Sequence, residues 1–130
     1  MADGVLSKIL YVEDEPDIQE VARMALETFG GYTVETCSSG EEAMEKGPGF
    51  NPDLILMDVM MPGMDGPTTL QAMRETAEMK DTPVIFMTAK VMETELERFR
   101  ELGAADVIPK PFDPVTLADQ VKEIWDRVTS

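Results

Sequence analysis

The 130-residue sequence contains no histidine, and this absence excludes several kinds of chemistry. Without an imidazole there is no histidine general base, no histidine metal ligand and no Ser-His or Cys-His catalytic pair. Any reaction must therefore use carboxylates, hydroxyls, lysines or a hard metal ion. The single cysteine, Cys37, has no partner for an internal disulfide, which fits a reducing compartment.

Basic residues and long apolar segments are also scarce. Lysine and arginine total 11 against 26 aspartates and glutamates, so the formal net charge is −15. A surface this acidic repels nucleic acid and anionic lipid, so we expect no nucleic-acid partner and no membrane partner. No apolar run approaches the roughly 20 residues that a membrane span needs, and the N-terminus lacks the layout of a signal peptide. We therefore expect a soluble, cytoplasmic protein.

The chain alternates short apolar runs with helical patterns. The expected strands are Lys8–Val12, Tyr32–Thr36, Leu54–Met57, Pro83–Met87 and Val107-Ile108. The expected helices run from Pro16 to the Gly30-Gly31 pair, over Ser39–Lys46 up to the Gly47-Pro48-Gly49 breaker, near Thr68–Ala77, over Lys90–Leu102 and over about Pro114–Val128. Five β/α units without a repeat or linker predict one α/β domain with a doubly wound, five-stranded parallel sheet and helices on both faces.

Helical spacing also predicts which side chains face the sheet. In the first helix these are Ile18, Val21, Ala22, Ala25 and Phe29. In the last two helices they are Met92, Leu96 and Phe99, then Leu117, Val121, Ile124 and Val128, with Trp125 packing on the flank. Among the methionines, Met57 and Met87 lie within apolar strands and should be core, whereas Met60, Met61 and Met64 are candidates for contact with a partner.

Polar residues follow four of the expected strands. They are Glu13 and Asp14 after the first strand, Asp58 after the third, Thr88 after the fourth and Lys110 after the fifth. Each residue alone has an ordinary explanation as a helix cap, a charge near a helix end or a solvated side chain. Together they fall at the carboxyl ends of parallel strands, where such sheets bind ligands. We therefore interpret them as one site.

The chemistry of this site points to phosphoryl transfer. Three carboxylates at one sheet edge repel one another unless a cation neutralises them, and oxygen ligands without histidine suit Mg²⁺. Thr88 can donate a hydrogen bond to a phosphoryl oxygen, and Lys110 supplies a compact positive charge. Phosphoryl transfer needs chiefly such positioning and neutralisation, with Asp58 as the nucleophile.

Four segments resemble the response-regulator receiver family in order and spacing: ILYVEDEPD, DLILMDVMMPGMDG, PVIFMTAK and IPKPF. The resemblance runs from about Lys8 to Val128 and implies a flavodoxin-like sheet in the order 2-1-3-4-5. It also implies a phospho-accepting domain of a two-component system or phosphorelay, supplied by a histidine kinase or a histidine phosphotransfer protein. Such a domain catalyses its own phosphorylation and dephosphorylation but is not a turnover enzyme.

The resemblance also assigns roles to residues. Asp58 would be the phosphoacceptor, Asp14 and Asp58 would bind Mg²⁺ directly, the Met60 backbone carbonyl would complete the protein ligands, and Glu13 would act mainly through water. Thr88 and Lys110 would contact the phosphoryl group, and the Lys110–Pro111 peptide bond would be cis. Val107 stands where the family often has Tyr or Phe, and Glu13 where Asp is commoner. Met60 and Lys90 lie near the site and could influence hydrolysis.

Three other functions are compatible with parts of this pattern. A flavodoxin-like electron carrier would need a Ser/Thr/Gly-rich loop after the first strand to hold the flavin phosphate, and this chain has Glu13-Asp14-Glu15-Pro16 there. A metal-dependent aspartyl phosphatase normally carries its nucleophile after the first strand, whereas Asp58 follows the third. A receiver-like scaffold that is never phosphorylated would not need all five polar residues.

We expect one domain over residues 1–130, with 1–7 as an N-terminal tail and no output domain. The signal would then leave through a protein surface, by resemblance the last two helices and the fifth strand, or the domain would serve as a phosphorelay intermediate. The sequence names neither the kinase nor the downstream target.

Overall fold

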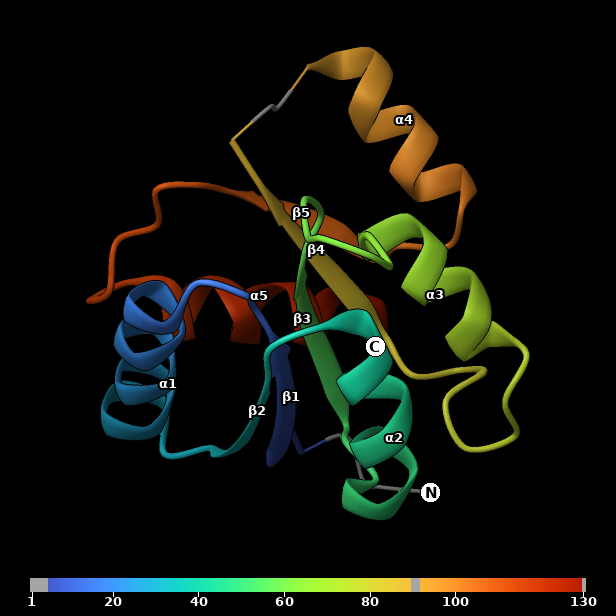
Figure 1. Cartoon of the computed structure of the whole chain (residues 1–130). Coiled ribbons are helices and arrows are strands. Elements are labelled where there is room, and N and C mark those ends of the chain that lie inside the picture. Colours follow the sequence, from blue (N-terminus) through green and yellow to red (C-terminus); the bar gives the residue numbers. More distant parts are fainter. Residues whose placement is uncertain (1–4, 90–91, 130) are drawn as a thin grey trace.

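The computed structural model describes residues 5–89 and 92–129. Its five strands form one sheet of parallel pairs in the order β2-β1-β3-β4-β5 (Figure 1). They are β1 (Lys8–Val12), β2 (Thr33–Cys37), β3 (Leu54–Asp58), β4 (Val84–Thr88) and β5 (Asp106–Pro109). The predicted fold class and the strand order implied by the resemblance are confirmed, and each strand end lies within about one residue of its prediction, as such boundaries allow.

Helices cover both faces of the sheet, as predicted. They are α1 (Pro16–Gly30), α2 (Gly40–Phe50), α3 (Gly66–Arg74), α4 (Glu93–Glu101) and α5 (Leu117–Thr129). Helices α1 and α5 pack on one face around Leu26 and Trp125, in what we call the α1/α5 core. Helices α2, α3 and α4 pack on the other face around Met73 and Phe99, in what we call the α2–α4 core (Figure 1).

Alternation along the strands divides the sheet between these two cores. In β1, Ile9 and Tyr11 join the α1/α5 core, whereas Leu10 and Val12 join the α2–α4 core. Both sets are fully buried, which explains why β1 reads as a continuous apolar run after Lys8. Since side chains alternate with a period of two, Glu13 continues the positions that face α1 and α5.

Local signals account for the first helix. Pro16 occupies the first turn, where its missing N–H costs nothing, and Gly31 ends the helix in the left-handed conformation with φ at 70°. The apolar face was only partly predicted. Ala22 and Ala25 are buried as expected, but Val21 is 45% exposed and Phe29 is 58% exposed, and Leu26, which the pattern did not select, is fully buried. Phe29 lies at the end of the helix, beyond the central part that packs on the sheet.

The predicted break at Gly47-Pro48-Gly49 is wrong, because α2 continues through it to Phe50. Gly47 is buried, and a Cβ there would lie 2.6 Å from the sulfur of Met79, so a side chain at this position would displace the end of the Met79 side chain. The Asn51 N–H donates to the Gly47 carbonyl at 2.8 Å and closes the last turn, with Asn51 itself at φ 55°. Tertiary packing therefore overrides the low helix propensity of this segment.

The later helices are shorter than predicted. Helix α3 begins at Gly66 because Asp65 caps it by accepting from the Thr68 N–H at 2.9 Å. Helix α4 begins at Glu93, and the first two residues of its predicted span, 90 and 91, lie outside the described residues. Phe99 is buried and Leu96 is half-buried, whereas Met92 is 63% exposed, so the predicted apolar face of α4 is confirmed only in part.

Helix α5 begins at Leu117, three residues after the predicted start, and keeps most of its predicted face. Leu117, Val121, Ile124 and Trp125 are buried, whereas Val128 is exposed near the end of the helix. The predicted N-terminal tail also packs in part, because Leu6 is buried in the α1/α5 core. Within the described residues, no helix is both long and apolar enough to cross a bilayer.

The packing of α1 gives a test with an internal control. Leu26→Ala removes a fully buried side chain from the α1/α5 core and should lower the free energy of unfolding by about 2–5 kcal/mol. Phe29→Ala removes a larger side chain that is mostly exposed, so it should cost less than about 1 kcal/mol. Urea unfolding of both variants measures the difference, and an equal or larger loss for Phe29→Ala would contradict this packing.

Candidate functional site at the carboxyl ends of the strands

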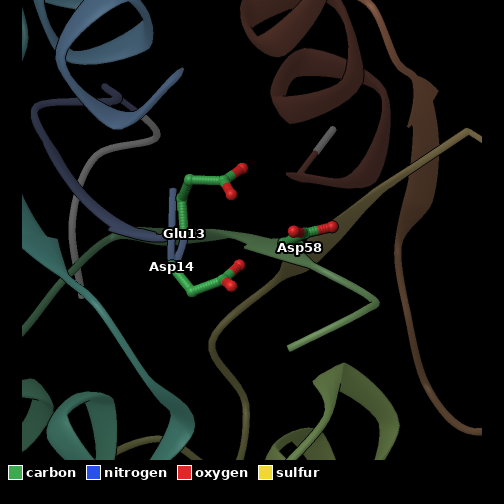
Figure 2. Close-up of side chains that lie close together, drawn as sticks. All are labelled: Glu13, Asp14 and Asp58. Carbon is green, nitrogen blue, oxygen red and sulfur yellow. The ribbon is translucent and has the colours of Figure 1, made fainter. Parts of the chain in front are cut away.

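Acidic side chains from two strands meet at one edge of the sheet. Glu13 and Asp14 follow β1, and Asp58 ends β3, which is the neighbour of β1 in the sheet. Carboxylate oxygens from the three residues lie within 4.8 Å of one another (Figure 2). Glu13 and Asp58 are buried and Asp14 is half-buried. The convergence that the sequence predicted is therefore present.

Lys110 joins two of these carboxylates from β5. Its Nζ lies 3.1 Å from Glu13 Oε1 and 3.3 Å from Asp58 Oδ2. Burial acts to lower the pKa of Lys110, but the contacts with Glu13 and Asp58 outweigh burial and the net shift is upward. The ammonium therefore stays charged and forms the cationic side of the site.

The environment of Asp58 disfavours the ionised form of its carboxylate. Burial and the nearby Glu13 raise its pKa from 3.8 to about 6, although Lys110 and a hydrogen bond from the Met60 backbone N–H act in the opposite direction. The carboxylate is still mostly ionised at neutral pH. Its charge is only partly compensated by the groups around it.

Glu13 is held more firmly. Its Oε1 accepts hydrogen bonds from the Lys110 ammonium and from the Tyr11 hydroxyl, the latter at 3.3 Å. Its Oε2 accepts from the Glu15 backbone N–H at 3.1 Å. Burial is the main cause that raises the pKa of Tyr11, so this hydroxyl keeps its proton and remains a donor. Both carboxylate oxygens of Glu13 thus have donors from the protein itself.

Thr88 lies beside Lys110 because β4 and β5 are paired. Thr88 aligns with Pro109, and the Lys110 N–H donates to the Thr88 carbonyl at 2.9 Å. Thr88 is buried. The Lys110–Pro111 bond is cis, as the resemblance implied. Val107, where the family often has an aromatic residue, is half-buried against the α2–α4 core.

The methionines near the site have different environments. Met60 is 73% exposed and Met64 is half-buried, whereas Met61 is buried in the α2–α4 core. The prediction that Met61 is available for contact with a partner is therefore wrong. Met57 and Met87 are fully buried, as predicted. Lys90, which we also expected near the site, lies outside the described residues.

Three residues that support the site were not identified from the sequence. Tyr11 lies within an apolar run that predicts only core packing. Gln19 on α1 donates to the Glu13 carbonyl at 2.8 Å and to the Cys37 carbonyl at 3.2 Å, so it joins the loops after β1 and β2. At Gly66 a Cβ would lie 2.8 Å from the Asp58 carbonyl oxygen, which requires glycine there. The sequence alone does not indicate this close approach at Gly66.

The donor set fits a hard divalent cation. Glu13, Asp14 and Asp58 offer only oxygen atoms, and the Lys110 ammonium contacts two of these carboxylates, those of Glu13 and Asp58. Mg²⁺ is typically bound by one or two carboxylates with backbone carbonyls, water and phosphate oxygens. The residues present therefore suit the ion that the sequence predicted.

A doubly wound parallel sheet with an acidic, lysine-bearing cluster at its carboxyl edge is the architecture of a two-component receiver. The sequence model of the response regulator receiver domain matches residues 9–122. The chain belongs to this family. It is accordingly a phospho-accepting domain of two-component signalling.

Individual relatives agree with the family assignment. The chain is 41% identical over 123 residues to the transcriptional regulatory protein ResD of Bacillus subtilis, covering 95% of this chain and 50% of ResD. It is also 41% identical over 120 residues to the regulatory protein PhoP of the same organism, covering 92% of this chain and 49% of PhoP. The chain thus spans about half the length of these curated relatives.

Solved structures agree as well. The structure of the chemotaxis protein CheY4 of Vibrio cholerae superposes with a TM-score of 0.85 at 31% identity, over 92% of this chain and 99% of the other. The receiver domain of a signal transduction histidine kinase from Syntrophus aciditrophicus gives a TM-score of 0.80 at 36% identity, over 94% of this chain and 92% of the other.

The raised pKa of Asp58 predicts how stability depends on pH without metal. The folded state binds this proton more tightly than the unfolded chain, so the associated stabilisation is fully present below about pH 4 and is lost as pH rises through about 6. Asp58→Asn removes the titration. The stability of the mutant relative to wild type should therefore rise between pH 4 and pH 7 in EDTA.

Chemical denaturation across this pH range measures the effect. Glu123→Gln, which removes an exposed charge on α5, is the control for the general loss of one negative charge. A difference between Asp58→Asn and wild type that stays constant with pH, or that matches the control, would contradict the assigned environment of Asp58.

Proposed function

We propose that Asp58 is the phosphoacceptor of this receiver domain and that Mg²⁺ is required for its phosphorylation. The observation that supports this most directly is the shared ammonium of Lys110, which lies 3.1 Å from Glu13 and 3.3 Å from Asp58. A nucleophilic carboxylate beside a fixed cation is what transfer of an anionic group needs. The pKa of about 6 leaves Asp58 ionised at neutral pH.

In the proposed reaction, an Asp58 carboxylate oxygen forms a bond to phosphorus while the bond from phosphorus to the donor's nitrogen breaks. The donor keeps that electron pair, and the product is an acyl phosphate on Asp58. Lys110 moves its ammonium toward the new phosphoryl oxygens, and the Thr88 hydroxyl donates to one of them. These two residues bind and orient the group, which is most of what phosphoryl transfer asks of a protein.

Asp14, Asp58 and the Met60 backbone carbonyl would hold the metal directly, with Glu13 acting through water. When bound, the ion neutralises charge between Asp58 and the incoming phosphoryl group. Glu13 suits an indirect role because its two oxygens already accept hydrogen bonds from Lys110, Tyr11 and Glu15.

The phosphodonor is proposed to be a histidine kinase or a histidine phosphotransfer protein. This chain has no histidine, so the phosphohistidine must come from another protein or domain. A cleft of about 380 Å³ at Asp58 is bordered by Ile18, Met60 and Pro111, and exposed Met60 gives its rim an apolar contact for such a partner. The cytoplasmic location remains a prediction from the sequence, which names no downstream target, and we propose no turnover activity on an external substrate.

Of the alternatives, the scaffold that is never phosphorylated is the one that experiment must exclude. With Mg²⁺ and acetyl phosphate, the protein should gain one phosphoryl group at Asp58, seen by intact mass and located by peptide mass spectrometry. The adduct should be released by hydroxylamine, as an acyl phosphate is. Asp58→Asn should gain none, and labelling that persists in this mutant would refute the assignment.

Mg²⁺ should also stabilise the fold, because the unfolded chain separates the carboxylates that the native state brings together. At a hundredfold excess over its dissociation constant, the ion should raise the free energy of unfolding by about 2.7 kcal/mol. This corresponds to several degrees in melting temperature. Asp58→Asn should gain clearly less, whereas Glu123→Gln should respond as wild type does. Thermal melts at fixed ionic strength test this, and equal gains in all three proteins would mean that Asp58 does not bind the ion.

A further inference from the structure

Tyr11 connects the interior of the domain to the candidate site. The side chain is fully buried in the α1/α5 core, yet its hydroxyl reaches Glu13 Oε1 at 3.3 Å. Tyr11 and Glu13 lie two residues apart, so both side chains leave the same face of the sheet. A phenylalanine would fill this place in the core without the hydrogen bond, so core packing alone does not account for the hydroxyl.

Two donors share the same oxygen of Glu13. Oε1 accepts from the Tyr11 hydroxyl and from the Lys110 ammonium, and Oε2 accepts from the Glu15 backbone N–H. Glu13 is fully buried, and removing the hydrogen-bond donors of a buried carboxylate leaves its charge uncompensated, which destabilises the folded protein. Any movement of Lys110 away from Glu13 therefore depends on the donors that stay behind.

We infer that Tyr11 is a positioning residue that releases Lys110 from Glu13. This role rests on the proposed phosphorylation of Asp58. During phosphoryl transfer, the Lys110 ammonium turns from Glu13 toward the phosphoryl group. The Tyr11 hydroxyl then remains as the donor to Glu13 Oε1. Without this hydroxyl, Glu13 draws Lys110 more strongly and competes with the phosphoryl group for the ammonium.

Tyr11→Phe tests the inference, because it keeps the ring and removes only the hydroxyl. Phosphorylation of Asp58 by acetyl phosphate at saturating Mg²⁺ should slow by roughly threefold to tenfold, the range expected for one hydrogen bond. Tyr32→Phe is the matched control. Tyr32 is the other tyrosine of the chain and lines a cleft between α1 and α5 with Phe29 and Trp125. Loss of the Tyr32 hydroxyl should leave the rate of Asp58 phosphorylation unchanged.

A double-mutant cycle separates positioning from packing. In Glu13→Asp the carboxylate is one methylene shorter and withdraws from the Tyr11 hydroxyl. Adding Tyr11→Phe to this background should therefore cost nothing further in rate. An equal slowing by Tyr11→Phe in both backgrounds would mean that the tyrosine acts through the core and not through Glu13, and the inference would be overturned.

A second measurement needs neither metal nor phosphodonor. In metal-free protein, the NMR signal of the Lys110 side-chain ammonium, assigned by its loss in Lys110→Ala, reports hydrogen exchange with water. Exchange should slow by roughly twofold or more in Tyr11→Phe, because Glu13 holds the ammonium more tightly. Unchanged or faster exchange would contradict the inference.

The outcomes distinguish the two proposals. Absence of phosphoryl transfer to wild type would refute the proposed function, and the inference about Tyr11 would fall with it. Normal transfer in wild type with an unchanged rate in Tyr11→Phe would refute only the role of Tyr11.

Discussion

A sheet of parallel strands sends every strand's carboxyl end to the same edge, and the rest of this structure depends on what that edge must accommodate. Glu13, Asp14 and Asp58 lie there, and among the residues that the structure describes the Lys110 ammonium is placed between two of them. Alternation along β1 and β3 turns Glu13 and Asp58 toward the same side of the sheet. The fold therefore concentrates negative charge in a place where little water can screen it, and the raised pKa of Asp58 records the free-energy cost.

The surrounding backbone is arranged to keep these charges in position. The Glu15 N–H and the Gln19 side chain hold the loop after β1, and the Met60 N–H bonds to Asp58 in the loop after β3. Gly66 lets α3 begin directly against the Asp58 carbonyl. None of these contacts neutralises the acidic cluster completely. Within residues 5–89 and 92–129 the site is therefore ordered in advance and still short of positive charge, a condition that favours a cation and an ammonium acting together on a phosphoryl group.

The features that could be predicted from the sequence are those fixed by local pattern and by the rule for parallel sheets. Fully apolar runs indicated buried strands, and polar residues directly after them indicated a common edge. Contacts between distant elements could not be predicted in this way. Gly47 continues α2 because the helix packs on Met79, and helical spacing does not say that α1 rests on Leu26 and leaves Phe29 exposed. Tyr11 was missed because a tyrosine within an apolar strand gives no sign of where its hydroxyl ends.

Helix α4 buries fewer residues against the domain than each of the other helices does. Phe99 is its one buried side chain within Glu93–Glu101, where it meets Phe86 edge-to-face with ring centroids 5.1 Å apart, and Met92 at the start of the helix provides no side-chain cap. Because Phe99 is the one buried side chain of Glu93–Glu101 and Leu96 is only half-buried, we expect the local opening of this helix to cost a small part of the global free energy of unfolding. Its amide hydrogens are then exchanged through openings that leave the sheet intact, and the helix can be rearranged on its own while the acidic edge keeps its geometry.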